Sequence, residues 1–134
     1  MRTTQQIDNE SAAVRENIKE LQTDKERTAE ALEKIKSVRQ ANAFNALSSG
    51  DAKAQQKLEK ANEEQVSLQV KIENIDFALT EAQQKLHALR AEREQVFIEE
   101  KRAEFLKLGE VALQQSRNID ERTITLATEL IGHR

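Results

Sequence analysis

The two histidines, His87 and His133, are the residues of this sequence best suited to hold a metal ion. A zinc site on a helix typically needs a second ligand three or four residues away, because such residues share one helix face. His87 has Arg90 and Ala91 at those spacings, and His133 is far away in the sequence. We therefore expect no metal site.

Two pairs of neighbouring carboxylates, Glu63-Glu64 and Glu99-Glu100, could in principle exchange protons with a substrate. Consecutive helix residues do not face each other, so both pairs are expected to lie on a solvated face. The chain has no cysteine, and it contains no glycine-rich phosphate loop. We expect neither catalysis nor binding of a cofactor or small molecule, and predict that the chain is not an enzyme.

The composition favours long helices over a compact globule. Charged residues make up 34% of the 134 residues and aromatic residues 3%, and there is no proline. A globular core of this size would normally bury several large rings, and four phenylalanines cannot supply them. Disorder is the alternative for so hydrophilic a chain, but the regular apolar spacing described below argues against it.

The charge distribution gives no reason to expect nucleic acid or an anionic membrane as a partner. The formal net charge is −3, and acidic and basic residues are mixed along the whole chain. The first residues lack the apolar core of a signal peptide. No apolar run approaches the ~20 residues that span a bilayer, so we predict a cytoplasmic setting.

Residues 54–96 carry the clearest helical pattern. Thirteen positions follow one another at alternating spacings of four and three residues, and eleven of them are apolar. This repeat averages 3.5 residues per turn, so its side chains stay on one face of a left-handed supercoil. We call these positions the seam of the second helix: Ala54, Leu58, Ala61, Gln65, Leu68, Ile72, Ile75, Leu79, Ala82, Leu86, Leu89, Arg93 and Val96.

A first helix is predicted to carry the same repeat less regularly. Thr3 is expected to cap its start, with Gln6 completing a capping box. After it come Ser49, Gly50 and Asp51: glycine accepts the left-handed conformation that ends a helix, and serine or aspartate caps the next one. We therefore place a hairpin turn at 47–51. The seam of the first helix is Ile7, Ser11, Val14, Ile18, Leu21, Lys25, Thr28, Leu32, Ile35, Arg39, Asn42 and Ala46.

Folding the chain at Gly50 brings the two seams into register. Facing residues of an antiparallel pair have numbers with a constant sum, and the seams match at a sum of 100, so that Leu21 faces Leu79. The turn and the seams are identified from independent features. Their agreement predicts an all-α fold, with a long antiparallel two-helix coiled-coil hairpin over residues 1–96 that is roughly 60–65 Å long.

Three charged residues occupy predicted seam positions: Lys25, Arg39 and Arg93. Their long aliphatic stems allow the charged ends to reach water, which is the simpler interpretation. The alternative is that they fix the register or exclude wrong oligomers.

Residues 97–134 are predicted to be a helical extension with no partner inside the hairpin. Glu100, Lys107 and Glu110 take the next seam positions, while a broader apolar set begins at Phe97. Gly109 is a possible weak point. Asn118 resembles an N-cap with Glu121 at the third position, so a short last helix is expected from about 119. This helix could fold back on residues 97–113 or pair with another chain, and a parent chain longer than Arg134 is possible.

Apolar residues outside the seam form a candidate protein interface. Val38, Ala41, Phe44 and Leu47 lie off the seam of the first helix, the last two near the tip. Scattered apolar residues are normal on surfaces, but the combined set suggests a protein partner. Most simply this partner is another copy, which would give a homo-oligomeric bundle. The candidate interface residues are Val66, Val70, Phe77, Phe97, Ile98, Phe105, Leu106, Leu108, Leu113, Ile124, Leu130 and Ile131.

The turn segment Ala46-Leu47-Ser48-Ser49-Gly50-Asp51-Ala52-Lys53, running into the seam from Leu58 to Leu79, resembles a recurring helical hairpin of small proteins encoded by bacterial phages and prophages. The resemblance covers about residues 30–90. It implies a place in phage particle assembly or host takeover, and it assigns no functional residues.

Two functions therefore stand as expectations. The first is a structural, assembly or scaffold protein that acts through coiled-coil self-association. The second is an adaptor or inhibitor that docks its C-terminal helices or hairpin tip on a single host protein. A monomer at high concentration would count against the first and is what the second predicts.

Overall fold

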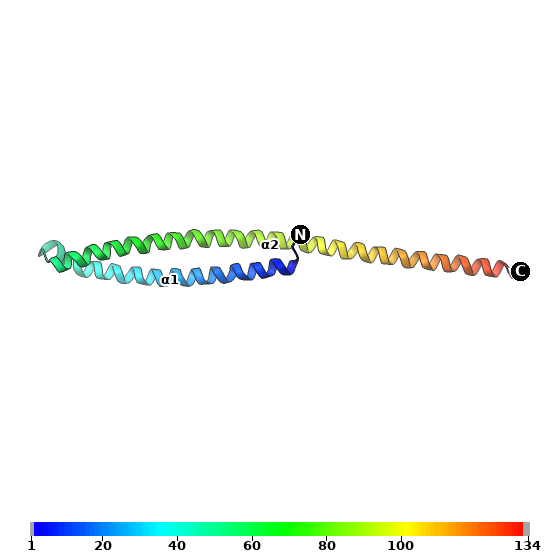
Figure 1. The fold of residues 1–134 in the computed structure, drawn as a ribbon, viewed down its shortest axis with the longest axis horizontal. Coiled ribbons are helices and arrows are strands. Elements are labelled where there is room, and N and C mark those ends of the chain that lie inside the picture. Colours follow the sequence, from blue (N-terminus) through cyan, green and yellow to red (C-terminus); the bar gives the residue numbers. More distant parts are fainter. Residues whose placement is uncertain (1, 133–134) are drawn as a thin grey trace.

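The protein is a two-helix antiparallel hairpin with a long single-helix extension (Figure 1). The computed structural model describes residues 2–132. Helix α1 spans Thr4–Ser48 and helix α2 spans Ala52–Gly132. At about 1.5 Å per residue, α1 is about 68 Å long and α2 about 120 Å long. The predicted all-α hairpin is confirmed, and α2 continues far beyond the level at which α1 begins.

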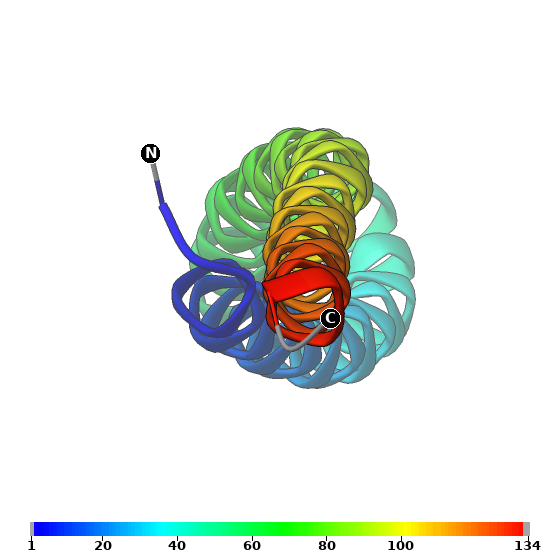
Figure 2. The ribbon, with the colours of Figure 1, turned by 90° about the vertical axis from the view of Figure 1, so that its right-hand side faces the viewer.

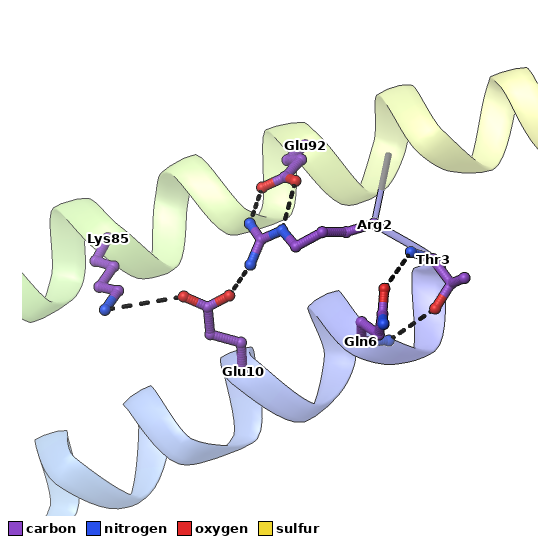
Figure 3. A network of polar contacts seen from close by, with 6 residues as sticks. All are labelled: Arg2, Thr3, Gln6, Glu10, Lys85 and Glu92. Carbon is purple, nitrogen blue, oxygen red and sulfur yellow. Dashed lines mark hydrogen bonds and ion pairs between the residues drawn. The ribbon is translucent and has the colours of Figure 1, made fainter.

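The start of α1 is fixed by the predicted capping box. The Gln6 backbone N–H donates to the Thr3 hydroxyl oxygen at 3.2 Å, and the Thr3 backbone N–H donates to the Gln6 side-chain oxygen at 2.9 Å (Figure 3). Two N–H groups that the helix itself cannot satisfy are thereby paired.

The chain reverses at Ser49, Gly50 and Asp51, within the predicted turn at 47–51, while Leu47 and Ser48 still belong to α1. Ser49 is the C-cap of α1, and Gly50 has a φ of +65°, in the left-handed region that favours glycine. The Asp51 carboxylate accepts hydrogen bonds from the backbone N–H groups of Lys53 at 3.0 Å and Ala54 at 3.5 Å. Asp51 is therefore the N-cap of α2, and three consecutive residues reverse the chain.

Replacing Gly50 tests how strongly this turn depends on the left-handed conformation. A Cβ atom at Gly50 would meet nothing within 4 Å, so the cost of Gly50→Ala comes from the backbone alone. We expect the free energy of unfolding to fall by about 1–2 kcal/mol, measured by urea denaturation. Gly50→Asn is the matched control and should cost less, because asparagine tolerates this conformation. Equal stability of Gly50→Ala and the parent protein would contradict the conformational role.

The two helices pack through the predicted seams. Every seam position is buried or half-buried except Arg39 and Arg93, whose side chains are exposed. Ile7 is completely buried, and Val14, Leu89 and Val96 join it in a buried apolar cluster near the open end of the hairpin. The apolar core is thus a single line of contacts between two helices, with small residues such as Ala46, Ala54 and Ala61 near the turn.

Polar contacts between the helices agree with the predicted register. Lys25 pairs with Asp76 at 2.6 Å, Arg93 with Asp8 at 2.6 Å, and Lys71 with Asp24 at 3.3 Å. The residue numbers in each pair add to a value close to 100. Exposed pairs of this kind contribute about 0.2–1 kcal/mol each, so they orient the helices more than they hold them together.

All three charged seam residues extend their ends toward solvent and find partners on the other helix. Lys25 and Arg93 make the ion pairs above, and the Arg39 guanidinium donates to the Gln65 side-chain oxygen at 2.8 Å. The simpler interpretation, that long side chains reach water from the seam, therefore describes their positions.

The predicted break near Asn118 is wrong. Helix α2 runs without interruption through Gly109 and Asn118 to Gly132, so there is no separate last helix and no fold back on residues 97–113. The sequence contains no proline, which is the residue that would most strongly end the helix here. The hydroxyls of Thr123 and Thr125 donate to the carbonyls of Ile119 and Glu121 at 2.9 Å each, so local polar groups bond within the helix and form no cap.

Candidate protein-interaction surface

A polar network closes the open end of the hairpin. The Arg2 guanidinium bridges the carboxylates of Glu10 on α1 and Glu92 on α2, and the Lys85 ammonium lies 3.8 Å from Glu10 (Figure 3). About two turns beyond Glu92 on α2, the Thr4 hydroxyl donates to the Glu100 carboxylate at 2.9 Å. These contacts mark the level at which α2 leaves α1.

Beyond this level α2 is a single exposed helix, which we call the extension (residues 97–132). Figure 1 shows it continuing the line of the hairpin, with the start of α1 near the middle of the molecule and the end of α2 at its far end. Figure 2 shows the same molecule from the extension's end. Every residue from Lys101 to Ile131 is exposed, so the apolar side chains of the extension contact water.

The structure places all of the predicted interface residues on the surface. In the hairpin, Val66, Val70 and Phe77 are 60%, 47% and 72% exposed. In the extension, Phe97 and Ile98 are 44% and 46% exposed. The others are exposed between 62% and 76%: Phe105, Leu106, Leu108, Leu113, Ile124, Leu130 and Ile131.

Four of these residues belong to one regular stripe. Val70, Phe77, Ile98 and Phe105 are separated by multiples of seven residues. The first three each lie two residues after a seam position, and Phe105 continues the same spacing beyond the seam. Two residues correspond to about 200° around a helix, so the stripe lies on the side of α2 opposite α1. We call it the outer stripe: Val70, Phe77, Gln84, Ala91, Ile98, Phe105, Ala112, Ile119 and Leu126.

Sequence reasoning did not include Ile119 and Leu126, which are 62% and 61% exposed. Both lie in the segment predicted to form a separate last helix, whose face would have no fixed relation to the outer stripe. The signal that could have found them is the seven-residue spacing from Val70 onward. Only a continuous helix keeps these positions on one face.

The outer face of α1 provides an internal comparison. Its equivalent positions, two residues after seam positions, are polar except for the residue nearest the tip. They are Asn9, Glu16, Thr23, Glu30, Ser37 and Phe44. On α2 the first two positions of this phase, Gln56 and Glu63, are also polar, but from Val70 onward the outer stripe has one polar residue, Gln84, among nine. Two helices of the same hairpin therefore differ on their outer faces, and the apolar one continues along the whole extension.

The hairpin tip carries a smaller exposed apolar set. Phe44 and Leu47 are 74% and 81% exposed, and Val38 is 43% exposed. These residues lie on α1, outside the outer stripe.

The residues with potential for metal or acid–base chemistry do not converge. His87 is exposed on α2, and His133 lies outside the described residues. Among residues 2–132 there is no group of three histidine, cysteine, aspartate or glutamate side chains able to hold a metal ion. Glu63 and Glu64 are both exposed, and Glu100 accepts hydrogen bonds from Thr4.

The hollows on the surface are shallow and lie along the rod. One in the extension is lined by Asn118, Glu121, Arg122, Thr125 and Leu126, all from consecutive turns of one helix. A second lies between the hairpin helices and includes Ile35 and Leu68. In the part of the chain that the structure describes, neither helix contains a stretch long and apolar enough to cross a bilayer.

The surface available for recognition is thus a straight helical face with apolar residues at regular intervals. Comparisons of the chain with protein families, with curated proteins and with solved structures found no match.

Proposed function

We propose that the chain is a non-enzymatic structural protein that assembles with further copies of itself. In this proposal the hairpin is a coiled coil that acts as a rigid spacer, and the extension is the assembly segment. The observation that carries it is the outer stripe, which stays exposed and apolar along the full length of the extension.

The physical support is the stability of the extension. Most helical stability in proteins comes from packing an amphipathic face and not from intrinsic helix propensity. The extension spans 36 residues, and from Lys101 to Ile131 every one of them is exposed, without packing against α1. A second helix on the outer stripe would supply the missing packing and remove large apolar side chains from water, at about 25 cal/mol per Å² of buried apolar surface.

The phage hairpins that the turn segment resembles are compatible with this function. Particle assembly uses proteins that act as spacers or scaffolds, and a two-helix rod without a converging site is suited to that role. Under this proposal no residue is assigned to catalysis or to a cofactor.

Sedimentation equilibrium tests the proposal directly. The full chain is compared with a chain ending at Lys101, which retains the contact between Thr4 and Glu100. We expect the full chain to form a defined oligomer at micromolar concentrations. The shortened chain should be a folded monomer whose hairpin is intact by circular dichroism. A full chain that stays monomeric at millimolar concentration would overturn self-assembly.

The exposed tip supports a second candidate, an adaptor that docks on one host protein. Phe44 and Leu47 lie beside the turn, and neither belongs to the outer stripe. If the full chain is monomeric, the tip and the extension become the docking surfaces. Substituting Phe44 and Leu47 by serine should then abolish binding to that protein without altering the melting temperature.

A further inference from the structure

We propose that the occupant of the outer stripe is the extension of a second copy, running antiparallel and centred near Gln114. This inference rests on the proposed self-assembly and adds the orientation and register of the pair. Three observations support it: a second row of residues beside the outer stripe, the sizes of the side chains in both rows, and the charged residues that flank them.

A second row of residues follows the outer stripe in the extension, four residues after each stripe position. We call it the companion row: Arg102, Gly109, Ser116, Thr123 and Leu130. Stripe and row together repeat at alternating spacings of four and three, which is the spacing of the seam against α1. The extension therefore carries a second seam on the opposite side of α2.

Side-chain sizes favour pairing the stripe with the companion row. In an antiparallel pair, each stripe residue faces a companion residue of the other copy. When facing numbers add to 228, Phe105 meets Thr123, Ile119 meets Gly109, and Ala112 meets Ser116. Two of these three layers set a large side chain against a small one, and the innermost layer pairs two small residues, which allows the helix axes to approach closely.

Gly109 supports this arrangement independently. Glycine inside a helix costs roughly 0.5–1 kcal/mol relative to alanine, yet a Cβ atom at Gly109 would meet nothing within 4 Å in the single chain. Nothing in the hairpin therefore requires glycine at this position. In the antiparallel pair, Gly109 leaves room for Ile119 of the second copy.

Charges beside this seam select the register. When seam numbers add to 228, the positions just before the companion row face one another at a sum of 230. Lys101 then approaches Glu129 of the second copy, and the uncharged Gln115 approaches its own equivalent. Lowering the sum by seven would set Lys101 against Arg122, and like charges at that distance repel. Raising it by seven would place Glu129 opposite Leu108 and lose its pairing with Lys101.

The same reasoning disfavours a parallel pair. A parallel arrangement in register would place two Arg102 side chains next to each other within the seam, where burial makes their repulsion costly. In the antiparallel pair Arg102 faces Leu126, and its aliphatic stem can cover that side chain. Two hairpins would then point away from each other at the ends of a shared two-helix stretch about 50 Å long.

Distances between spin labels on single-cysteine variants test the orientation. The chain has no cysteine, so Gln114→Cys and Thr128→Cys each carry one label. Both positions lie on the side of α2 away from the outer stripe, so the labels do not disturb the pair. In the antiparallel pair the two Gln114 labels are level along the axis, whereas the two Thr128 labels are 28 residues apart, or about 42 Å.

The expected result is a short distance for Gln114→Cys and a much longer one for Thr128→Cys, both lost on dilution with unlabelled chain. Equal short distances at both positions would establish a parallel pair and overturn this inference, while self-assembly would stand. No interchain distance, together with a monomeric mass by sedimentation equilibrium, would overturn both proposals.

Discussion

Leu79→Asp should lower the free energy of unfolding by about 3 kcal/mol and the melting temperature by at least 10 °C. Leu79 is half-buried in the seam, where the register places it opposite the half-buried Leu21. The substitution removes apolar burial and puts a charge between two helices, close to the existing carboxylate of Asp76. A protein stable by only 5–15 kcal/mol is sensitive to such a change.

Gln83→Asp is the matched control, because it introduces the same residue one turn later at an exposed position of α2. Thermal unfolding followed by circular dichroism, at one protein concentration, compares the two variants. Equal melting temperatures would contradict the seam. Adding Leu21→Lys to Leu79→Asp should restore part of the lost stability, because facing residues would then carry opposite charges.

The second large effect is expected from Phe105→Glu, which should weaken self-association at least 100-fold. Phe105 is 76% exposed in the single chain, so the hairpin should remain as stable as before. Burying one phenylalanine contributes about 1.5–3 kcal/mol, and a symmetric pair loses two of them. Each 1.4 kcal/mol is a factor of ten in the dissociation constant, so two or more factors of ten are expected.

Phe77→Glu is a closely matched control for this prediction. Phe77 is 72% exposed and belongs to the same outer stripe, but it lies in the hairpin, outside the stretch shared by two antiparallel extensions. Sedimentation equilibrium should find association unchanged in Phe77→Glu. An equal loss in both variants would indicate a bundle that includes the hairpins, and no loss in Phe105→Glu would exclude the extension as the interface.

The hairpin could be predicted from the sequence because two independent local signals agreed. Gly50 and Asp51 locate the turn through backbone conformation and capping, and the seams follow from apolar spacing alone. The structure has the glycine in the left-handed region and buries or half-buries the matching apolar positions. Charged seam residues did not obscure the pattern, since their long side chains extend to solvent.

The extension was harder to predict because its signals are ambiguous. Asn118 and Glu121 form an N-cap pattern, but the same residue types also occur within helices when nothing forces the chain to turn. If a new helix began at Asn118, its faces would have no fixed relation to those of the preceding helix. Ile119 and Leu126 would then not be grouped with Phe105. In the continuous helix all three lie on one face, and the outer stripe becomes visible.

The length of α2 has a hydrodynamic consequence. An unbroken helix of 81 residues gives a 15.3 kDa chain a high frictional ratio. Such a rod tumbles slowly and elutes from a gel-filtration column well ahead of a globular protein of the same mass. A monomer would therefore elute at an apparent mass typical of a dimer. Assembly must be followed by methods that measure mass independently of shape, such as light scattering or sedimentation equilibrium.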